Sequence, residues 1–208
     1  MSPLSFRVFE SSTPKHKQPV APAAPSTSAA MLVSLQQDLA EAQSELTRLR
    51  QAAVRDPITG GANMRALSMA WEGQDPADPL SLLMIDIDGF RRVNRTLGRA
   101  CGDAVLKAVT TTMERALRWD DVVAREGADR FIVMLPLAIE EDAFAVAERI
   151  RESIAKMCFE VAQGRFKLTV RAGVASRREG DELETLIGRS ERACREGKTM
   201  GGNTISFE

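Results

Sequence analysis

Asp86 and Asp88 stand one residue apart at the C-terminal end of the apolar run Leu80–Ile87. The run predicts a buried strand, and alternate strand residues point to the same face, so the two carboxylates should lie together. Buried unpaired charge is costly, and Mg²⁺ binds carboxylate oxygens together with substrate phosphates. The pair therefore indicates a metal site. Alternatively, Asp88 caps the next helix and Asp86 pairs with an arginine or a lysine, and these residues alone leave both interpretations open.

A second charged pair, Asp129 and Arg130, occupies the tip of a predicted hairpin between the strands Val122–Arg125 and Phe131–Leu135. If this hairpin neighbours the strand that carries Asp86, Asp129 supplies a third carboxylate to the same cation. The alternatives are a hydrated turn and a catalytic corner that has lost one of its residues.

Asn94 and Asp103 flank two glycines beyond the first apolar strand. A side-chain amide and a carboxylate can together satisfy the Watson–Crick edge of guanine, which offers a carbonyl acceptor and N–H donors. Because Asn and Asp are also common in turns and caps, the pair alone does not decide its role. Lys198, in a glycine-rich segment, can contact phosphate, although a single lysine there is more often solvated.

The elements that must position these side chains alternate between helix and strand from residue 56 onward. Periodicity predicts helices at Asn63–Glu72, after a cap at Gly102-Asp103, at Ala143–Ile154 and at Leu183–Ala193. Two further strands are predicted, a half-buried one over Phe166–Val174 and a short closing one over Thr204–Phe207. The order β-α-α-β-β-α-β-α-β, after an entry helix, predicts an α+β fold with a ferredoxin-like central sheet flanked by helices.

The segment before this domain has the pattern of a coiled coil. Its apolar residues alternate spacings of three and four, at Leu32, Leu35, Leu39, Ala42, Leu46, Leu49 and Ala53. We predict a coiled-coil helix over residues 31–55 and a homodimer through residues 32–53; the alternative is a single helix packed on its own domain. Residues 1–30 are rich in Pro, Ala and Ser and are predicted to form a disordered tail.

Composition restricts the classes of partner and compartment. The formal net charge of −1 gives no field that attracts nucleic acid. No apolar run approaches the roughly 20 residues needed to span a bilayer, and no cleavable secretion signal begins the sequence. The cysteines Cys101, Cys158 and Cys194 lack paired spacing, which is typical of reduced thiols. We expect a cytoplasmic protein with no nucleic-acid partner and no membrane span.

Several motifs across residues 56–208 resemble the GGDEF domain of diguanylate cyclases, which make cyclic di-GMP from GTP. They are DPITGGANMR (56–65), DIDGFRRVNRTLGRACGD (86–103), AREGADRF (124–131), RAGVAS (171–176) and SERACREGKTMGGN (190–203). The resemblance implies a nucleotide-cyclase palm-like fold and a Mg²⁺ ion that is present only if GTP binds. It implies metal binding by Asp86, the Ile87 backbone and Asp129. It also implies GTP binding by Asn94, Asp103 and Lys198.

The departures from the family pattern concentrate at the signature hairpin, which reads Gly127-Ala128-Asp129-Arg130-Phe131. Ala128 adds a Cβ where the family backbone lies close to phosphates and where a positive φ is expected. Arg130 replaces an acid, and this charge reversal about 5 Å from a cation is worth a few kcal/mol at an effective dielectric of about 20. Gly202 stands where the family has a phosphate-contacting arginine. These positions predict a degenerate catalytic site, in which Asp129 acts only if the chain is active; alternatively, Arg130 faces solvent and Asp129 still works.

Arg118 and Asp121, in the segment RWDD before the hairpin, match the R-x-x-D of the family's product-inhibition site. Arginine binds phosphate and the Hoogsteen face of guanine, and a carboxylate accepts from the guanine N–H groups. Arg149, on the next helix, matches a second arginine that assists in the family. Taken alone, R-x-x-D also occurs at any salt-bridged helix end.

The preferred hypothesis is a receptor or regulatory protein of bacterial second-messenger signalling that binds cyclic di-GMP through Arg118, Asp121 and Arg149. Its output would be a change in dimerisation or in binding to an unknown protein partner. One alternative is a diguanylate cyclase with an unorthodox active site that uses Asp86 and Asp129 with Mg²⁺. Others are a GTP-binding regulator without turnover and a scaffold that binds no nucleotide.

Overall fold

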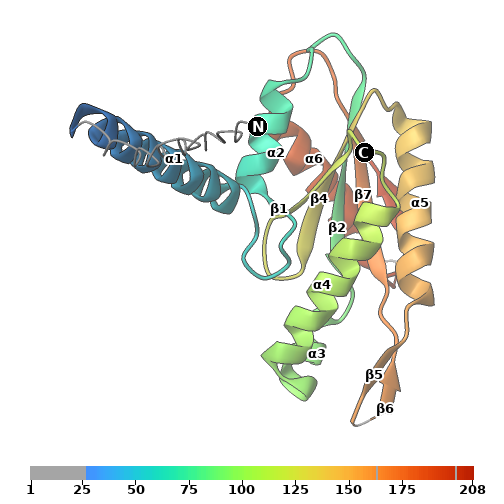
Figure 1. Cartoon of the computed structure of the whole chain (residues 1–208). Helices are drawn as coiled ribbons and strands as arrows, with labels where there is room; N and C mark the ends of the chain where they lie inside the picture. The colour runs from blue at the N-terminus through green and yellow to red at the C-terminus, as the bar shows by residue number, and fades with distance from the viewer. Residues whose placement is uncertain (1–26, 163, 200) are drawn as a thin grey trace, which may run out of the picture. The chain divides into compact units, whose positions relative to one another are not determined.

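The computed structural model describes residues 27–162, 164–199 and 201–208. Its centre is a six-stranded mixed sheet of order β1-β3-β4-β2-β7-β8 (Figure 1). The pairs β1–β3 and β7–β8 are parallel and the other neighbours are antiparallel. The strands are β1 (Ala62–Asn63), β2 (Leu80–Ile87), β3 (Val122–Arg125), β4 (Arg130–Pro136), β7 (Val170–Ser176) and β8 (Ile205–Phe207).

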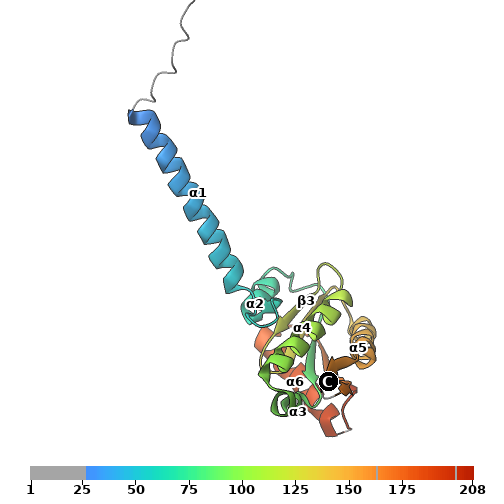
Figure 2. The same ribbon diagram turned by 60° about the horizontal axis from the view of Figure 1, so that its bottom comes forward.

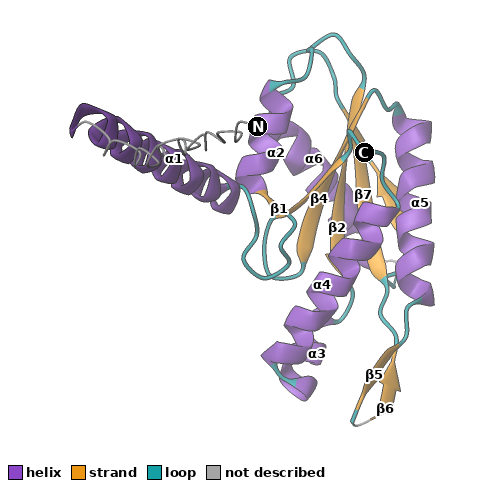
Figure 3. Cartoon of the chain, viewed as in Figure 1, coloured by secondary structure: helices purple, strands orange, loops and turns teal. Residues whose placement is uncertain are grey.

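Helices cover both faces of this sheet (Figure 3). On one face lie α3 (Phe90–Leu97), α4 (Arg99–Arg115) and α5 (Glu140–Lys156). On the other lie α2 (Met64–Glu72) and α6 (Leu183–Thr199). Helices α4 and α5 lie side by side in both views (Figures 1 and 2). The predicted α+β fold with a flanked central sheet is therefore confirmed.

Strand β2 is central, so both of its faces are buried. Leu83 and Ile85 pack into the core under α4 and α5, whereas Leu82 and Met84 pack into the core under α2 and α6. This explains why the strand is a continuous apolar run instead of an alternating one. Because β2 runs through the core, the charged residues at its C-terminal end lie at the edge of that core.

The predicted cap at Gly102-Asp103 is wrong. Helix α4 begins at Arg99, with Gly98 at the N-cap position at φ 83°. Gly102 is instead a packing residue, because a Cβ there would overlap the side-chain oxygen of Asn94. The glycine therefore permits α3 and α4 to approach closely, a tertiary requirement that the local sequence does not distinguish from a cap.

The single half-buried strand predicted over Phe166–Val174 is also wrong. Its first part belongs to a separate hairpin of β5 (Phe159–Val161) and β6 (Gly164–Phe166), in which Phe159 and Phe166 stack at 5.2 Å between ring centroids. Its second part is β7, which is buried on both faces between α5 and α6. Period-two alternation continued through the connection and concealed the break.

Helix α1 (Thr27–Ala53) begins four residues before the predicted start at residue 31. The leucines of the predicted coiled-coil seam are all 48–61% exposed: Leu32, Leu35, Leu39, Leu46 and Leu49. Most of the predicted disordered tail lies outside the described residues. Within the described ranges, none of the helices combines the length and apolar character needed to cross a membrane.

Strand β7 and helix α6 meet at Gly173. A Cβ on this residue would overlap the Ser190 carbonyl oxygen and the Cys194 backbone nitrogen of α6. We predict that Gly173→Ala lowers the free energy of unfolding by about 1–3 kcal/mol, the usual cost of overpacking a core.

Gly188→Ala is the matched control on α6, because its Cβ would meet no atom within 4 Å. It should be neutral or stabilising by up to about 1 kcal/mol, since alanine favours helix more than glycine does. Urea unfolding followed by circular dichroism measures both. Equal unfolding midpoints for the two variants would contradict the close approach.

Candidate functional site

Asp86 and Asp88 lie on either side of the Arg171 guanidinium. Arg171 of β7 is the register partner of Asp86 of β2. Its Nη2 lies 2.7 Å from Asp86 Oδ2, and its Nη1 lies 2.7 Å from Asp88 Oδ1. The three side chains are 11–19% exposed. The predicted placement of both carboxylates on one face is confirmed, but an arginine lies between them.

Asp88 has further partners besides Arg171. Its Oδ2 accepts a hydrogen bond from Thr169 Oγ1 at 2.7 Å and another from the Asn203 backbone N–H at 2.9 Å. The N-cap position of α3 is Gly89, and no side chain caps that helix. The alternative proposed from sequence was therefore correct for Asp86, which pairs with an arginine, and wrong for Asp88 as a helix cap.

Gly202 lies directly against Asp88. Its φ is +78°, and a Cβ there would lie 2.8 Å from Asp88 Oδ2. Both the backbone conformation and the close contact disfavour a side chain at this position. The arginine of the family pattern would therefore require residues 201–203 to take a different path.

The signature hairpin packs against the end of β2, so the condition for Asp129 to lie near Asp86 is met. The backbone N–H groups of Glu126 and Gly127 donate to the Arg130 carbonyl at 3.0 and 3.4 Å, and the Ile87 N–H donates to the Asp129 carbonyl at 3.1 Å. The positive φ expected at Ala128 is wrong, since in the described ranges only Leu137 and Asn203 are non-glycine residues with positive φ. The extra methyl group of Ala128 therefore causes no backbone strain.

Arg125 ties the hairpin tip to the opening DPITG turn. Its Nη1 donates to both Asp56 carboxylate oxygens at 3.1 and 3.2 Å, and its Nη2 donates to the Ala128 carbonyl at 3.0 Å. Burial by itself raises the pKa of Asp56, but hydrogen bonds from Thr59 and Arg125 lower it overall. The carboxylate thus stays ionised and fixes the turn beside the tip.

Arg130 is not the solvent-facing residue that one alternative assumed. Its Nε lies 2.8 Å from Glu126 Oε2, and its Nη1 lies 2.8 Å from Glu191 Oε1 of α6; the side chain is 36% exposed. Burial raises the pKa of Glu126, which Arg130 opposes and Glu191 reinforces. The hairpin is therefore connected to α6 by the ion pair between Arg130 and Glu191.

A cavity of about 480 Å³ lies between the hairpin and the start of α3. The predicted metal residues Asp86, Ile87 and Asp129 all line it, together with Arg91, Arg130 and Arg171. Burial raises the pKa of Asp86 although Arg171 opposes the rise, and the nearby Asp129 adds to it. The structure thus brings the predicted metal residues together, but surrounds them with guanidinium groups.

These residues do not fit a divalent cation well. No group of three or more His, Cys, Asp or Glu side chains suited to holding a metal occurs in the described part of the chain. Asp86 Oδ2 and Asp88 Oδ1 are instead paired with Arg171. Sequence reasoning missed this arginine, although a charged residue at the start of a strand as apolar as RAGVAS was a signal.

The predicted guanine-binding residues lie on the neighbouring helices α3 and α4 and are not among the residues that line this cavity. Asn94 of α3 packs with its side-chain oxygen over Gly102, the residue before Asp103 in α4. Both Asn94 and Asp103 are half-buried. The side chain of Lys198, the predicted phosphate contact, lies outside the described residues.

The R-x-x-D segment forms a compact turn between α4 and β3. Asp121 Oδ2 accepts from the Arg118 backbone N–H at 2.7 Å, and Arg149 of α5 donates from Nε to the Ala116 carbonyl at 2.9 Å. Burial raises the pKa of Asp121, while the positive charges of Arg118 and Arg149 oppose the rise. Arg118 and Asp121 line a cavity of about 290 Å³. The structure thus gathers all three predicted residues at one corner.

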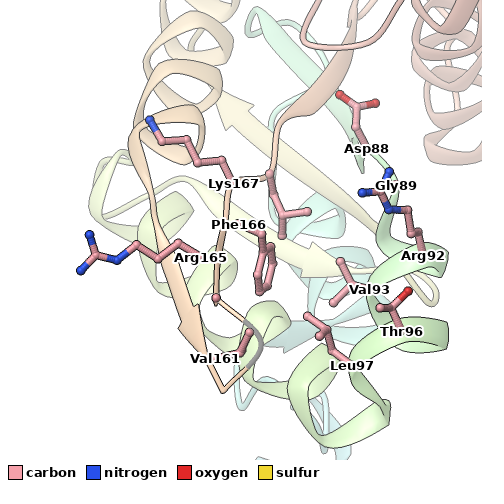
Figure 4. Close-up of a pocket in the computed structure, with 12 residues that line it drawn as sticks. Asp88, Gly89, Arg92, Val93, Thr96, Leu97, Val161, Arg165, Phe166 and Lys167 are labelled. Atoms are coloured by element: carbon pink, nitrogen blue, oxygen red, sulfur yellow. The ribbon is translucent and has the colours of Figure 1, made fainter.

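Another cavity, of about 330 Å³, separates α3 from the β5–β6 hairpin. Phe166 points toward Val93 and Leu97 across it, whereas Arg165 and Lys167 point away (Figure 4). It shares Asp88 with the site described above, but its lining includes neither Asn94 and Asp103 nor the residues of the R-x-x-D corner.

Residues 53–204 match the family model described as diguanylate cyclase, GGDEF domain. The chain is 33% identical over 171 residues to the response regulator PleD of Caulobacter vibrioides, a match over 78% of this chain and 38% of that protein. It is 34% identical over 155 residues to the diguanylate cyclase DgcZ of Escherichia coli, over 73% of this chain and 52% of that protein. The chain thus spans about half or less of these relatives.

Solved structures share the fold. The diguanylate cyclase SiaD of Pseudomonas aeruginosa, in complex with its activator SiaC, has a TM-score of 0.72 and 29% identity, covering 86% of this chain and 71% of that one. The coiled coil and GGDEF domain of DgcB from Caulobacter crescentus, in complex with c-di-GMP, has a TM-score of 0.80 and 24% identity, covering 86% and 98%. The second likeness concerns the fold alone. With the family model matching residues 53–204, this chain belongs to the GGDEF domain family.

Proposed function

We propose that this chain is a regulatory GGDEF protein that binds cyclic di-GMP and does not make it. The observation that carries the proposal is the convergence of Arg118, Asp121 and Arg149 at the corner between α4, β3 and α5. Cyclic di-GMP presents two phosphates and two guanines, which arginine and carboxylate groups recognise by charge-assisted hydrogen bonds.

Two members of this corner are held in position before any ligand arrives. Arg149 is anchored by its hydrogen bond to the Ala116 carbonyl, and Asp121 is held by the Arg118 backbone N–H. Anchored side chains lose less conformational entropy on binding, which favours affinity. Arg118 is exposed, so its guanidinium is accessible to a ligand.

Trp119 adds a feature to this corner that the sequence motif did not predict. It follows Arg118 and is 96% exposed, an unusual state for an indole. Stacking of a nucleic-acid base on an exposed aromatic ring contributes roughly 1–3 kcal/mol. We infer that Trp119 stacks on one guanine of the bound ligand.

The contacts of the signature hairpin support loss of catalysis. Arg130, in the place of a family acid, is ion-paired with Glu126 and Glu191, and Arg171 occupies the space between Asp86 and Asp88. The cavity lined by Asp86, Ile87 and Asp129 nevertheless favours a second candidate function, a cyclase or a GTP-binding regulator. A protein partner would carry the output; complexes with another protein occur among related structures, as with the cyclase SiaD and its activator SiaC.

Calorimetric titration with cyclic di-GMP tests the proposal. The wild type should bind, and Arg118→Ala should weaken binding at least tenfold, because a hydrogen bond to a charged group contributes roughly 1.5–3 kcal/mol. Trp119→Ala should weaken it less. Arg115→Ala removes another exposed arginine close by and serves as the control with unchanged affinity. Absence of wild-type binding, or equal affinity of Arg118→Ala, would exclude this site.

Turnover is tested by incubation with GTP and Mg²⁺ while the product is continuously removed. We expect no cyclic di-GMP above a protein-free blank. The acid of the family signature is replaced by Arg130, which pairs with Glu191, and Asp86 is paired with Arg171. Product that disappears in Asp129→Asn would instead establish the cyclase alternative.

We also propose that α1 self-associates through the seam at residues 32–53, because its leucines are exposed in the single chain. Sedimentation of the wild type should show a dimer, and Leu39→Arg should shift it to monomer by placing a charge in the seam. Gln37→Arg, off the seam on the same helix, is the control that should stay dimeric. A monomeric wild type, or a dimeric Leu39→Arg, would refute the seam.

A further inference from the structure

Arg171 lies where a metal ion would lie in a carboxylate site, and its positive charge neutralises the same carboxylates. Its guanidinium lies between two carboxylates, at 2.7 Å from each, and is only 11% exposed. We propose that Arg171 is a resident cation that neutralises Asp86 and Asp88, so that this GGDEF cavity does not take up a divalent cation at these residues. The proposal does not depend on cyclic di-GMP binding at Arg118.

The backbone fixes this arrangement. Arg171 and Asp86 are register partners on adjacent antiparallel strands in the middle of the sheet, so neither Cα can move without disturbing β2 and β7. The planar guanidinium pairs each of its two Nη atoms with a different carboxylate. A rotation of the Arg171 side chain would therefore break both ion pairs at once.

The Asp88 carboxylate already accepts from three donor groups. Its Oδ1 pairs with Arg171, and its Oδ2 accepts from Thr169 Oγ1 and the Asn203 N–H. A metal ion that recruited Asp88 would have to break at least one of these contacts. Gly202, pressed against the same carboxylate, adds a steric reason for Asp88 to stay in place.

The net charge of these three side chains also disfavours a divalent cation. Asp86 and Asp88 bring two negative charges and Arg171 brings one positive charge. A divalent cation on the same oxygens would lie next to the guanidinium and be repelled by it. If the arginine moved aside instead, a largely buried charge would lose both of its partners, which is strongly unfavourable. Removal of the guanidinium should therefore create a cation site from residues already present.

Mn²⁺ is a suitable probe, because the electron paramagnetic resonance signal of the free ion reports how much is bound. The wild type should show no Mn²⁺ site that depends on Asp86. Arg171→Ser should gain a site at least tenfold tighter than any wild-type binding. The double variant Arg171→Ser/Asp86→Asn should lose it again.

Arg192→Ser is the matched control, since it removes an equal charge from an exposed position on α6, where Arg192 pairs with Glu208. It should leave Mn²⁺ binding unchanged. Arg171→Lys keeps the charge and should not gain a site. A site gained by Arg192→Ser, or one that persists in the double variant, would show that general charge and not Arg171 controls binding.

The wild type decides the question even if Arg171→Ser fails to fold, which circular dichroism would reveal. Equal Mn²⁺ binding by the wild type and Asp86→Asn supports the resident cation. Mn²⁺ binding by the wild type that Asp86→Asn weakens tenfold or more would overturn it.

Discussion

The guanidinium of Arg171, held between the carboxylates of Asp86 and Asp88, is the interaction on which the arrangement of this site depends. It joins the charged ends of the two central strands, where the largely buried carboxylates would be costly without a charged partner. It also fixes Asp88, onto which the C-terminal segment folds through the Asn203 N–H and the close contact of Gly202. The pairing of β2 with β7, the loop at residues 201–203 and the cavity lined by Asp86 thus all contact Arg171 or its partner carboxylates.

The hairpin shows the same reorganisation of charge. Arg125 donates to Asp56 of the opening turn, and Arg130 pairs with Glu191 of α6, so both arginines hold the tip against the rest of the domain. The charged groups around the signature residues are thus paired within the protein.

Much of the fold could be predicted from sequence, because the signals were local. The apolar run Leu80–Ile87 and the helical faces of α5 and α6 follow from periodicity. The wrong or missing predictions depended on tertiary contacts. Gly102 packs against Asn94, and β7 is covered on both faces. The role of Arg171 follows only from its pairing with β2. Motif spacing proposed the candidate site residues, but it could not show that Arg171 lies between Asp86 and Asp88.

One calorimetric experiment addresses the central claim, that this domain binds the messenger without using a metal. The wild type is titrated with cyclic di-GMP, and separately with GTP, in Mg²⁺ and again in a chelator. We expect cyclic di-GMP to bind with the same affinity in both buffers, and no GTP binding that requires Mg²⁺. Absence of cyclic di-GMP binding, or GTP binding that appears only with Mg²⁺, would contradict the claim.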